Sequence, residues 1–310
     1  MAKWRGTILL CTLLLTACTA ETGQPKEQIQ EEKNDENIVV TKDGKITFEI
    51  KNEIGVPQEK VEAIKDEIVT AYDHIKDSIH TSYTPSEHIN VWFKEDGLSW
   101  GFASKIELTG VNEDIYPLVH EMTHSLLGYG NNFESDHGYF TQEGFASYME
   151  DQYGKNKLYF EKYMKHYLDS DKLIPISKLI DPNQDDVYFR PALSSEEQNR
   201  VLMEMSYTHA ASFVTYLIDT YGLEKFEHIY NEKELAQKLE EVYGKSSREL
   251  EKEWLAFIQQ QQGFTHEEKF KSGNFYDMNT ILLQIEPKYF AKYLSKPKRS
   301  LFGARGFTCV

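Results

Sequence analysis

The sequence is poor in two features that would place it at once in a structural class. It holds three cysteines among 310 residues, too few for the disulfide framework that small secreted domains use. Its body contains no run of about 18 consecutive apolar residues, so no segment there reads as a membrane-spanning helix. A fold of this composition must be stabilised by its hydrophobic core.

Positive charge is also in short supply. Lys and Arg number 34 against 50 Asp and Glu, which gives a formal net charge of -16. Such an acidic chain repels the phosphates of nucleic acids, and no basic stripe offsets the repulsion, so we expect no nucleic-acid partner. The proportions of apolar residues (40%) and charged residues (27%) are those of an ordinary globular protein.

The first eighteen residues, MAKWRGTILLCTLLLTAC, differ from the rest of the chain. Lys3 and Arg5 precede a short apolar stretch, a pattern that predicts a secretory signal peptide over residues 1–17. The closing residues LTAC resemble the lipobox of bacterial lipoproteins, in which the signal is cut before the cysteine. That resemblance implies that Cys18 carries a diacylglycerol. An ordinary secretory signal with an incidental cysteine is the alternative.

The next segment is suited to a tether. Residues 18–37 contain one large aliphatic residue, Ile29, and such a composition buries too little surface to fold. With Cys11 in the signal and Cys18 acylated, Cys309 would be the one remaining thiol. We therefore expect a protein anchored by lipid to the extracytoplasmic face of a bacterial cell membrane, and the lipobox resemblance favours a Gram-positive surface.

The remaining sequence predicts an α+β protein. Two β-rich runs flank Asp43-Gly44 and predict a hairpin, and apolar residues at helical spacing predict a helix over about 58–80. Further strands are expected over 89–93 and 102–108, with mostly helix from about 113 onward. Ser194 with Glu197, and Ser246 with Glu249, predict the starts of two helices. We expect one catalytic domain over residues 38–262, with a β-containing part (38–112) and a helical part (113–262), followed by an extension of unknown role (263–310).

The segment LVHEMTHSLLGYG contains two candidate metal ligands. His120 and His124 are four residues apart, so on a helix both rings project from one face and can reach one ion. Glu121 follows the first histidine, and this spacing is the zinc-protease signature. Asn112 or Asp114 is expected to cap the helix. The alternative is a helix that carries two histidines by accident, because the motif fixes only three positions.

A catalytic zinc ion takes three protein ligands and a water, so a third ligand is needed. The segment YFTQEGFASYMED supplies Glu143, at the start of a second helix that Thr141 is expected to cap. The small residues Gly144 and Ala146 would let this helix approach the metal helix. We therefore predict one Zn²⁺ per chain. The alternative reading of Glu143 is an acid favoured by the helix dipole.

HEMTH followed by QEGFASY resembles the gluzincins, which are zinc peptidases of the peptidase MA-like type. The segments SYTHAASFVTYLIDTYG and VYGKSSRELEKEWLAFI resemble later helices of that family, so the resemblance covers roughly residues 85–260. It implies a zincin-like fold, with a small N-terminal sheet that ends in an edge strand, a helical half, and the active site between them. Residues 102–108 resemble the edge strand along which such enzymes bind extended peptides.

The resemblance also implies a reaction, the hydrolysis of peptide bonds in a peptide or protein substrate with Glu121 as general base. The family usually adds an oxyanion donor from a later helix. The resemblance implies Tyr207 for this role, and His209 is its rival. Partners for the second nitrogens of the zinc histidines are sought among three acids: Glu150, Asp151 and Glu204. The alternative function is a catalytically silent surface lipoprotein that acts in binding or scaffolding.

Overall fold

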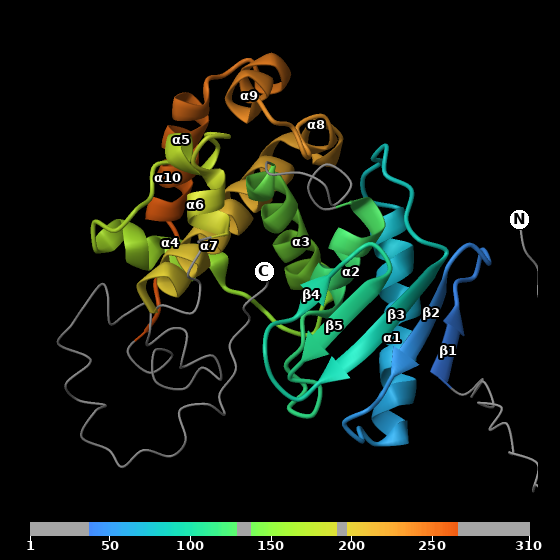
Figure 1. Cartoon of the computed structure of the whole chain (residues 1–310). Helices are drawn as coiled ribbons and strands as arrows, with labels where there is room; N and C mark the ends of the chain where they lie inside the picture. The colour runs from blue at the N-terminus through green and yellow to red at the C-terminus, as the bar shows by residue number, and fades with distance from the viewer. Residues whose placement is uncertain (1–36, 129–137, 191–196, 266–310) are drawn as a thin grey trace, which may run out of the picture. The chain divides into compact units, whose positions relative to one another are not determined.

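The computed structural model describes residues 37–128, 138–190 and 197–265 (Figure 1). Over these residues a five-stranded sheet comes first along the chain, and a mainly helical half follows. The expected α+β class is therefore confirmed. The strands are β1 (Ile38–Val40), β2 (Thr47–Lys51), β3 (His88–Lys94), β4 (Trp100–Gly101) and β5 (Lys105–Thr109).

Helix α1 (Gln58–Lys76) lies within the sheet region, and the other described helices follow it. None of the described helices is long and apolar enough to cross a membrane. The helices that follow α1 are α2 (Leu118–Leu127), α3 (Tyr139–Tyr153), α4 (Phe160–Asp169), α5 (Ile176–Leu179), α6 (Asp185–Phe189), α7 (Glu197–Tyr221), α8 (Leu223–Glu227), α9 (Leu235–Tyr243) and α10 (Ser247–Gln259).

The sheet is mixed, with the strand order β1-β2-β3-β5-β4. Strands β1 and β2 pair antiparallel around the turn at Asp43-Gly44, which confirms the expected hairpin. The neighbours β2, β3 and β5 run parallel to one another, and α1 connects β2 to β3. Helix α1 lies against one face of the sheet and buries the periodic apolar side chains that predicted it, including Val61, Ile64 and Ile68 (Figure 1).

The edge strand nearest the helical half is not the one that the sequence indicated. Strand β5, within the expected 102–108 segment, lies between β3 and β4, because Trp100 and Gly101 of β4 pair antiparallel with Glu107 and Ile106. The edge is therefore β4. The strand expected over 102–108 is thus confirmed as β5, but the expectation that it forms the edge was wrong. Strand β4 has two residues, too few to show the alternation by which a strand is recognised in sequence.

Helices α3 and α7 pack closely, and Gly144 makes this possible. A Cβ atom at Gly144 would lie 2.6 Å from Val214 Cγ2 and 2.8 Å from the Ala210 carbonyl oxygen, both on α7. We expected Gly144 and Ala146 to let α3 approach α2, and for Gly144 this was wrong, because its closest neighbours lie on α7. The small residue was read correctly as a point of close approach, but sequence does not say which neighbour approaches.

Several expectations lie wholly or largely outside the described residues. They are the signal peptide at 1–17, the lipidation of Cys18, the tether at 18–37, the cap at Ser194 and the extension at 263–310. The second capping box is described and confirmed: the Ser246 hydroxyl oxygen accepts from the Glu249 backbone N–H, and the Glu249 carboxylate accepts from the Ser246 N–H.

Candidate metal centre

Helix α2 supplies two side chains of the site, and every one of its residues from Leu118 to Leu127 is buried. It begins after Pro117, whose side chain makes no capping hydrogen bond. The cap comes from another helix, because Glu150 Oε2 of α3 accepts from the backbone N–H groups of Val119 (3.0 Å) and His120 (3.1 Å). The expectation that Asn112 or Asp114 caps this helix was therefore wrong.

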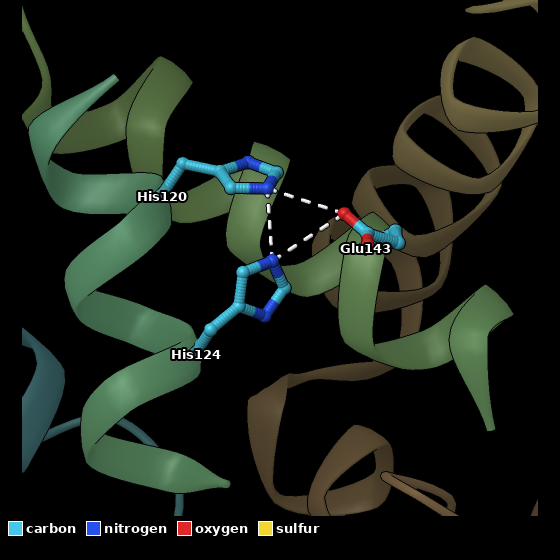
Figure 2. A group of neighbouring side chains, drawn as sticks. All are labelled: His120, His124 and Glu143. Carbon is cyan, nitrogen blue, oxygen red and sulfur yellow. Dashed lines mark hydrogen bonds and ion pairs between the residues drawn. The ribbon is translucent and has the colours of Figure 1, made fainter. Parts of the chain in front are cut away.

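Three donor atoms converge between α2 and α3 (Figure 2). His120 Nε2 and His124 Nε2 are 2.9 Å apart, and Glu143 Oε2 lies 3.2 Å from the first and 3.4 Å from the second. Two ligand atoms bound at 2.0–2.1 Å to one tetrahedral ion lie about 3.3 Å apart. The three separations are thus those of ligands around a single metal ion, and this group could hold one.

Burial and neighbouring groups shift the pKa values of two of the three donors, His120 and Glu143. Burial lowers the pKa of His120 to about 4, against the hydrogen bond to Glu143, which raises it. Burial raises the pKa of Glu143, but the charge of His124 and the hydrogen bonds from both rings outweigh it and lower the pKa to about 2. An ionised carboxylate and a neutral imidazole are the forms that bind metal ions.

The second oxygen of Glu143, Oε1, has its own partners. Tyr207 of α7 donates its hydroxyl to Oε1 at 2.8 Å, and Arg190 donates Nη2 to the same oxygen at 2.6 Å. Sequence reasoning named Tyr207 but missed Arg190. A lone arginine beside a proline carries no spacing signal, although a fully buried carboxylate ligand does require donors for its outer oxygen.

His209 lies elsewhere, two residues after Tyr207 on the same helix. Its ring stacks on Tyr167, its Nδ1 faces the Met205 carbonyl oxygen at 2.6 Å, and its Nε2 accepts from the Ile174 N–H at 3.0 Å. Burial lowers the pKa of His209 to about 4. Both ring nitrogens therefore bond to the backbone. The structure brings Tyr207, not His209, to the group of His120, His124 and Glu143, which is called the metal group below.

The acids expected to bond to the second nitrogens of His120 and His124 take other positions. Ser147 Oγ, which the sequence analysis did not consider, lies 3.5 Å from His120 Nδ1. Glu150 caps α2 as described, and burial raises its pKa to about 8, against the two backbone N–H bonds, which lower it. Asp151 accepts from the Leu158 N–H, and Glu204 lies half-buried on α7.

Thr141 is not the cap of α3, because the helix begins at Tyr139 and Thr141 lies within its first turn. Its hydroxyl donates to the Gly138 carbonyl and accepts from the Asn231 N–H.

The edge strand β4 contacts α2 at the backbone of Glu121 and beside His124. Glu121 is fully buried on α2. A Cβ atom at Gly101 of β4 would lie 2.2 Å from the Glu121 carbonyl oxygen and 3.0 Å from His124 Cβ. Only glycine allows the edge strand to approach the metal helix this closely. The group of His120, His124 and Glu143 therefore lies between two helices. Helix α2 packs on strands β4 and β5, and helix α3 packs on α7.

Comparison with known proteins adds no further support for a particular function. No protein-family model matches the chain, and no curated protein matches it significantly. The assignment of function accordingly rests on the buried group of His120, His124 and Glu143.

Proposed function

We propose that this protein is a zinc-dependent peptidase of the gluzincin type. The observation that carries the proposal is the convergence of His120, His124 and Glu143, with ligand-like separations, around one point. Two imidazoles and one carboxylate are a donor set typical of catalytic zinc, which keeps one coordination position for water. The sequence HEMTH also places a buried Glu121 directly beside the first ligand.

The residues around the group suit peptide hydrolysis. A zinc ion bound there would lower the pKa of a water molecule toward about 7 and stabilise negative charge on the substrate carbonyl oxygen. Glu121 takes up the proton of the attacking water at its carboxylate and passes it to the leaving amine. Tyr207 is the proposed donor for the developing oxyanion, and its hydroxyl must turn from Glu143 Oε1 to serve it.

Strand β4 is the natural place for an extended substrate in this proposal. It is the edge of the sheet on the side of α2, and its Gly101 touches the metal helix at Glu121. Backbone pairing with β4 would lay a peptide beside the metal group and give affinity with little side-chain selectivity.

The proposal extends to the cellular location. The signal at residues 1–17, a lipid on Cys18 and the polar segment 18–37 would hold the peptidase on the extracytoplasmic face of a bacterial cell membrane, with a Gram-positive surface as the favoured case. Mass spectrometry of the membrane-extracted protein tests this, because acylation adds the mass of a diacylglycerol at Cys18. The Cys18→Ala variant should lack that mass, and a wild type without it would contradict the anchor.

The decisive experiment compares the full chain with its Glu121→Gln and Glu143→Ala variants. We expect about one zinc per chain in the wild type and in Glu121→Gln, and little in Glu143→Ala. Cleavage of a peptide library should fall by roughly 10²–10⁴-fold or more in Glu121→Gln, because that variant keeps the metal and loses the base. Undiminished cleavage by Glu121→Gln would contradict the mechanism.

One observation favours the alternative function, a silent peptidase-like lipoprotein that binds or scaffolds. The Tyr207 hydroxyl, the expected oxyanion donor, is bonded to the third ligand and to Arg190. A zinc-loaded wild type that cleaves no peptide across a broad library would support this alternative.

A further inference from the structure

Arg190 directly follows helix α6 and reaches the metal group from outside the ligand set. Its Nη2 donates to Glu143 Oε1 at 2.6 Å, and its Nη1 donates to the Tyr207 hydroxyl oxygen at 2.5 Å and to the Phe189 carbonyl at 2.6 Å. The side chain is 19% exposed, whereas that of Glu143 is fully buried. One guanidinium therefore joins the third ligand to the expected oxyanion donor.

The two oxygens of the Glu143 carboxylate have different partners. Oε2 faces the two histidines, whereas Oε1 accepts from both Arg190 and Tyr207. Charge-assisted hydrogen bonds from a guanidinium are among the stronger ones in proteins, and their planar geometry fixes the plane of the carboxylate. With Oε1 engaged in this way, a single oxygen is presented to the position between the histidines.

We infer that Arg190 is a positioning residue for the metal group, holding Glu143 as a one-oxygen ligand and the Tyr207 oxygen beside it. This inference rests on the proposed metal site. Arg190 acts through Glu143 and Tyr207 and takes no part in proton transfer itself. An arginine suits the role better than a lysine, because two separate nitrogens of its rigid fork bind two partners at once.

The Tyr207 contact supports the same role. The hydroxyl accepts from Arg190 and donates to Glu143, so its oxygen stays fixed by the guanidinium when its proton turns to another acceptor. The guanidinium also lies over the Tyr139 ring, 4.9 Å from its centroid, so its position is set from a second direction.

The test is cobalt binding, measured on the full chain and on its Arg190→Gln, Arg190→Lys and Arg248→Gln variants. Co²⁺ reports its own coordination, because its visible absorption weakens when a fifth ligand atom joins four. We expect Arg190→Gln to bind Co²⁺ and Zn²⁺ about 10–100-fold more weakly, as removal of outer partners of metal ligands generally does. Its cobalt band should also weaken, because Glu143 Oε1 becomes available to the ion. Arg248 is exposed on α10, and its variant should match the wild type in both respects.

The Lys variant separates positioning from charge. Arg190→Lys keeps a positive charge but cannot hold both partners, so its band should also differ from that of the wild type, and it decides the matter if Arg190→Gln does not fold. A wild-type band and affinity in either folded Arg190 variant would overturn the inference and leave the proposed function intact. A folded wild type that binds neither metal would overturn the metal site itself.

A purely structural role for Arg190 predicts a different result. Such a role would lower the melting temperature of the metal-free protein and leave the absorption per bound cobalt unchanged. That outcome would also overturn the inference.

Discussion

Among the described residues, the buried histidines of α2 and the buried His209 of α7 serve different purposes. His120 and His124 turn their Nε2 atoms toward each other and toward a carboxylate. His209 is buried as deeply, and its pKa is also lowered to about 4, yet both its nitrogens bond to the backbone. Burial and a shifted pKa therefore do not identify a metal ligand. A candidate metal ligand is identified instead by a ring nitrogen that faces other side-chain atoms able to bind a metal, as His120 and His124 do.

The largest effect should come from removing one nitrogen of the metal group. We expect His124→Ala to lose zinc, with affinity lowered by at least about 100-fold, because two remaining ligands no longer enclose the ion. Metal content after dialysis against a weak chelator measures this. Zinc retained at wild-type stoichiometry would remove the distinction between the two kinds of histidine.

The matching change in the other region is His209→Phe. It should keep zinc at wild-type stoichiometry and lower the free energy of unfolding by about 3 kcal/mol, because the Met205 carbonyl and the Ile174 N–H both lose their partner in a buried setting. Urea denaturation beside a zinc assay reports both quantities. Loss of zinc at unchanged stability would contradict this assignment of roles.

His209 should also make stability depend on pH. Its pKa is about 4 in the folded protein and near the usual 6.5 in the unfolded chain, so the unfolded chain binds the extra proton between these values. Stability therefore falls as the pH drops from 7 toward 4, with about 2 kcal/mol lost by pH 5.

The His209→Phe variant is the control, since its stability should lack this component of the pH dependence. Tyr167, stacked on the ring, stays protonated throughout this range because burial raises its pKa well above the usual value. Equal slopes in the two proteins between pH 7 and 5 would show that His209 contributes nothing.

The smallest effect is expected at the cap of the metal helix. Glu150→Gln keeps an oxygen that can accept from the Val119 and His120 N–H groups, so its stability should stay within about 1 kcal/mol of the wild type, with zinc retained. Glu150→Met has no such oxygen and should lose about 2 kcal/mol. Thermal unfolding of the zinc-free proteins measures both. A large loss in Glu150→Gln would mean that the carboxylate charge, and not the acceptor geometry, holds the helix.

Sequence reasoning reached the parts of the structure that are written in local patterns. The hairpin around Asp43-Gly44 and the helix beginning at Gln58 follow from turn chemistry and apolar periodicity. Glu143 was found because a metal needs a third ligand, and the structure brings it to both histidines. Its prediction as a zinc ligand stays a prediction until metal is measured.

The parts that sequence reasoning missed depend on contacts between distant segments. Glu150 caps a helix that begins some thirty residues earlier, and Arg190 meets Glu143 from the end of α6. Strand β4 has two residues and no periodicity to detect. Gly144 was recognised as a point of close packing, but its neighbour proved to be α7. Such features follow from tertiary packing, for which a single sequence carries no local signal.

Helix α3 contacts α2 twice from one face. Glu143 points to the two histidines of α2, and Glu150, two turns later on α3, accepts hydrogen bonds at the start of α2. The number of residues between Glu143 and Glu150 therefore fixes the directions of the two carboxylates relative to each other. One residue inserted or deleted there would rotate one carboxylate by about 100° relative to the other, so only one of the two contacts could be kept. Natural variation in chain length should consequently avoid the stretch from 144 to 149, even though no residue in it belongs to the group of His120, His124 and Glu143.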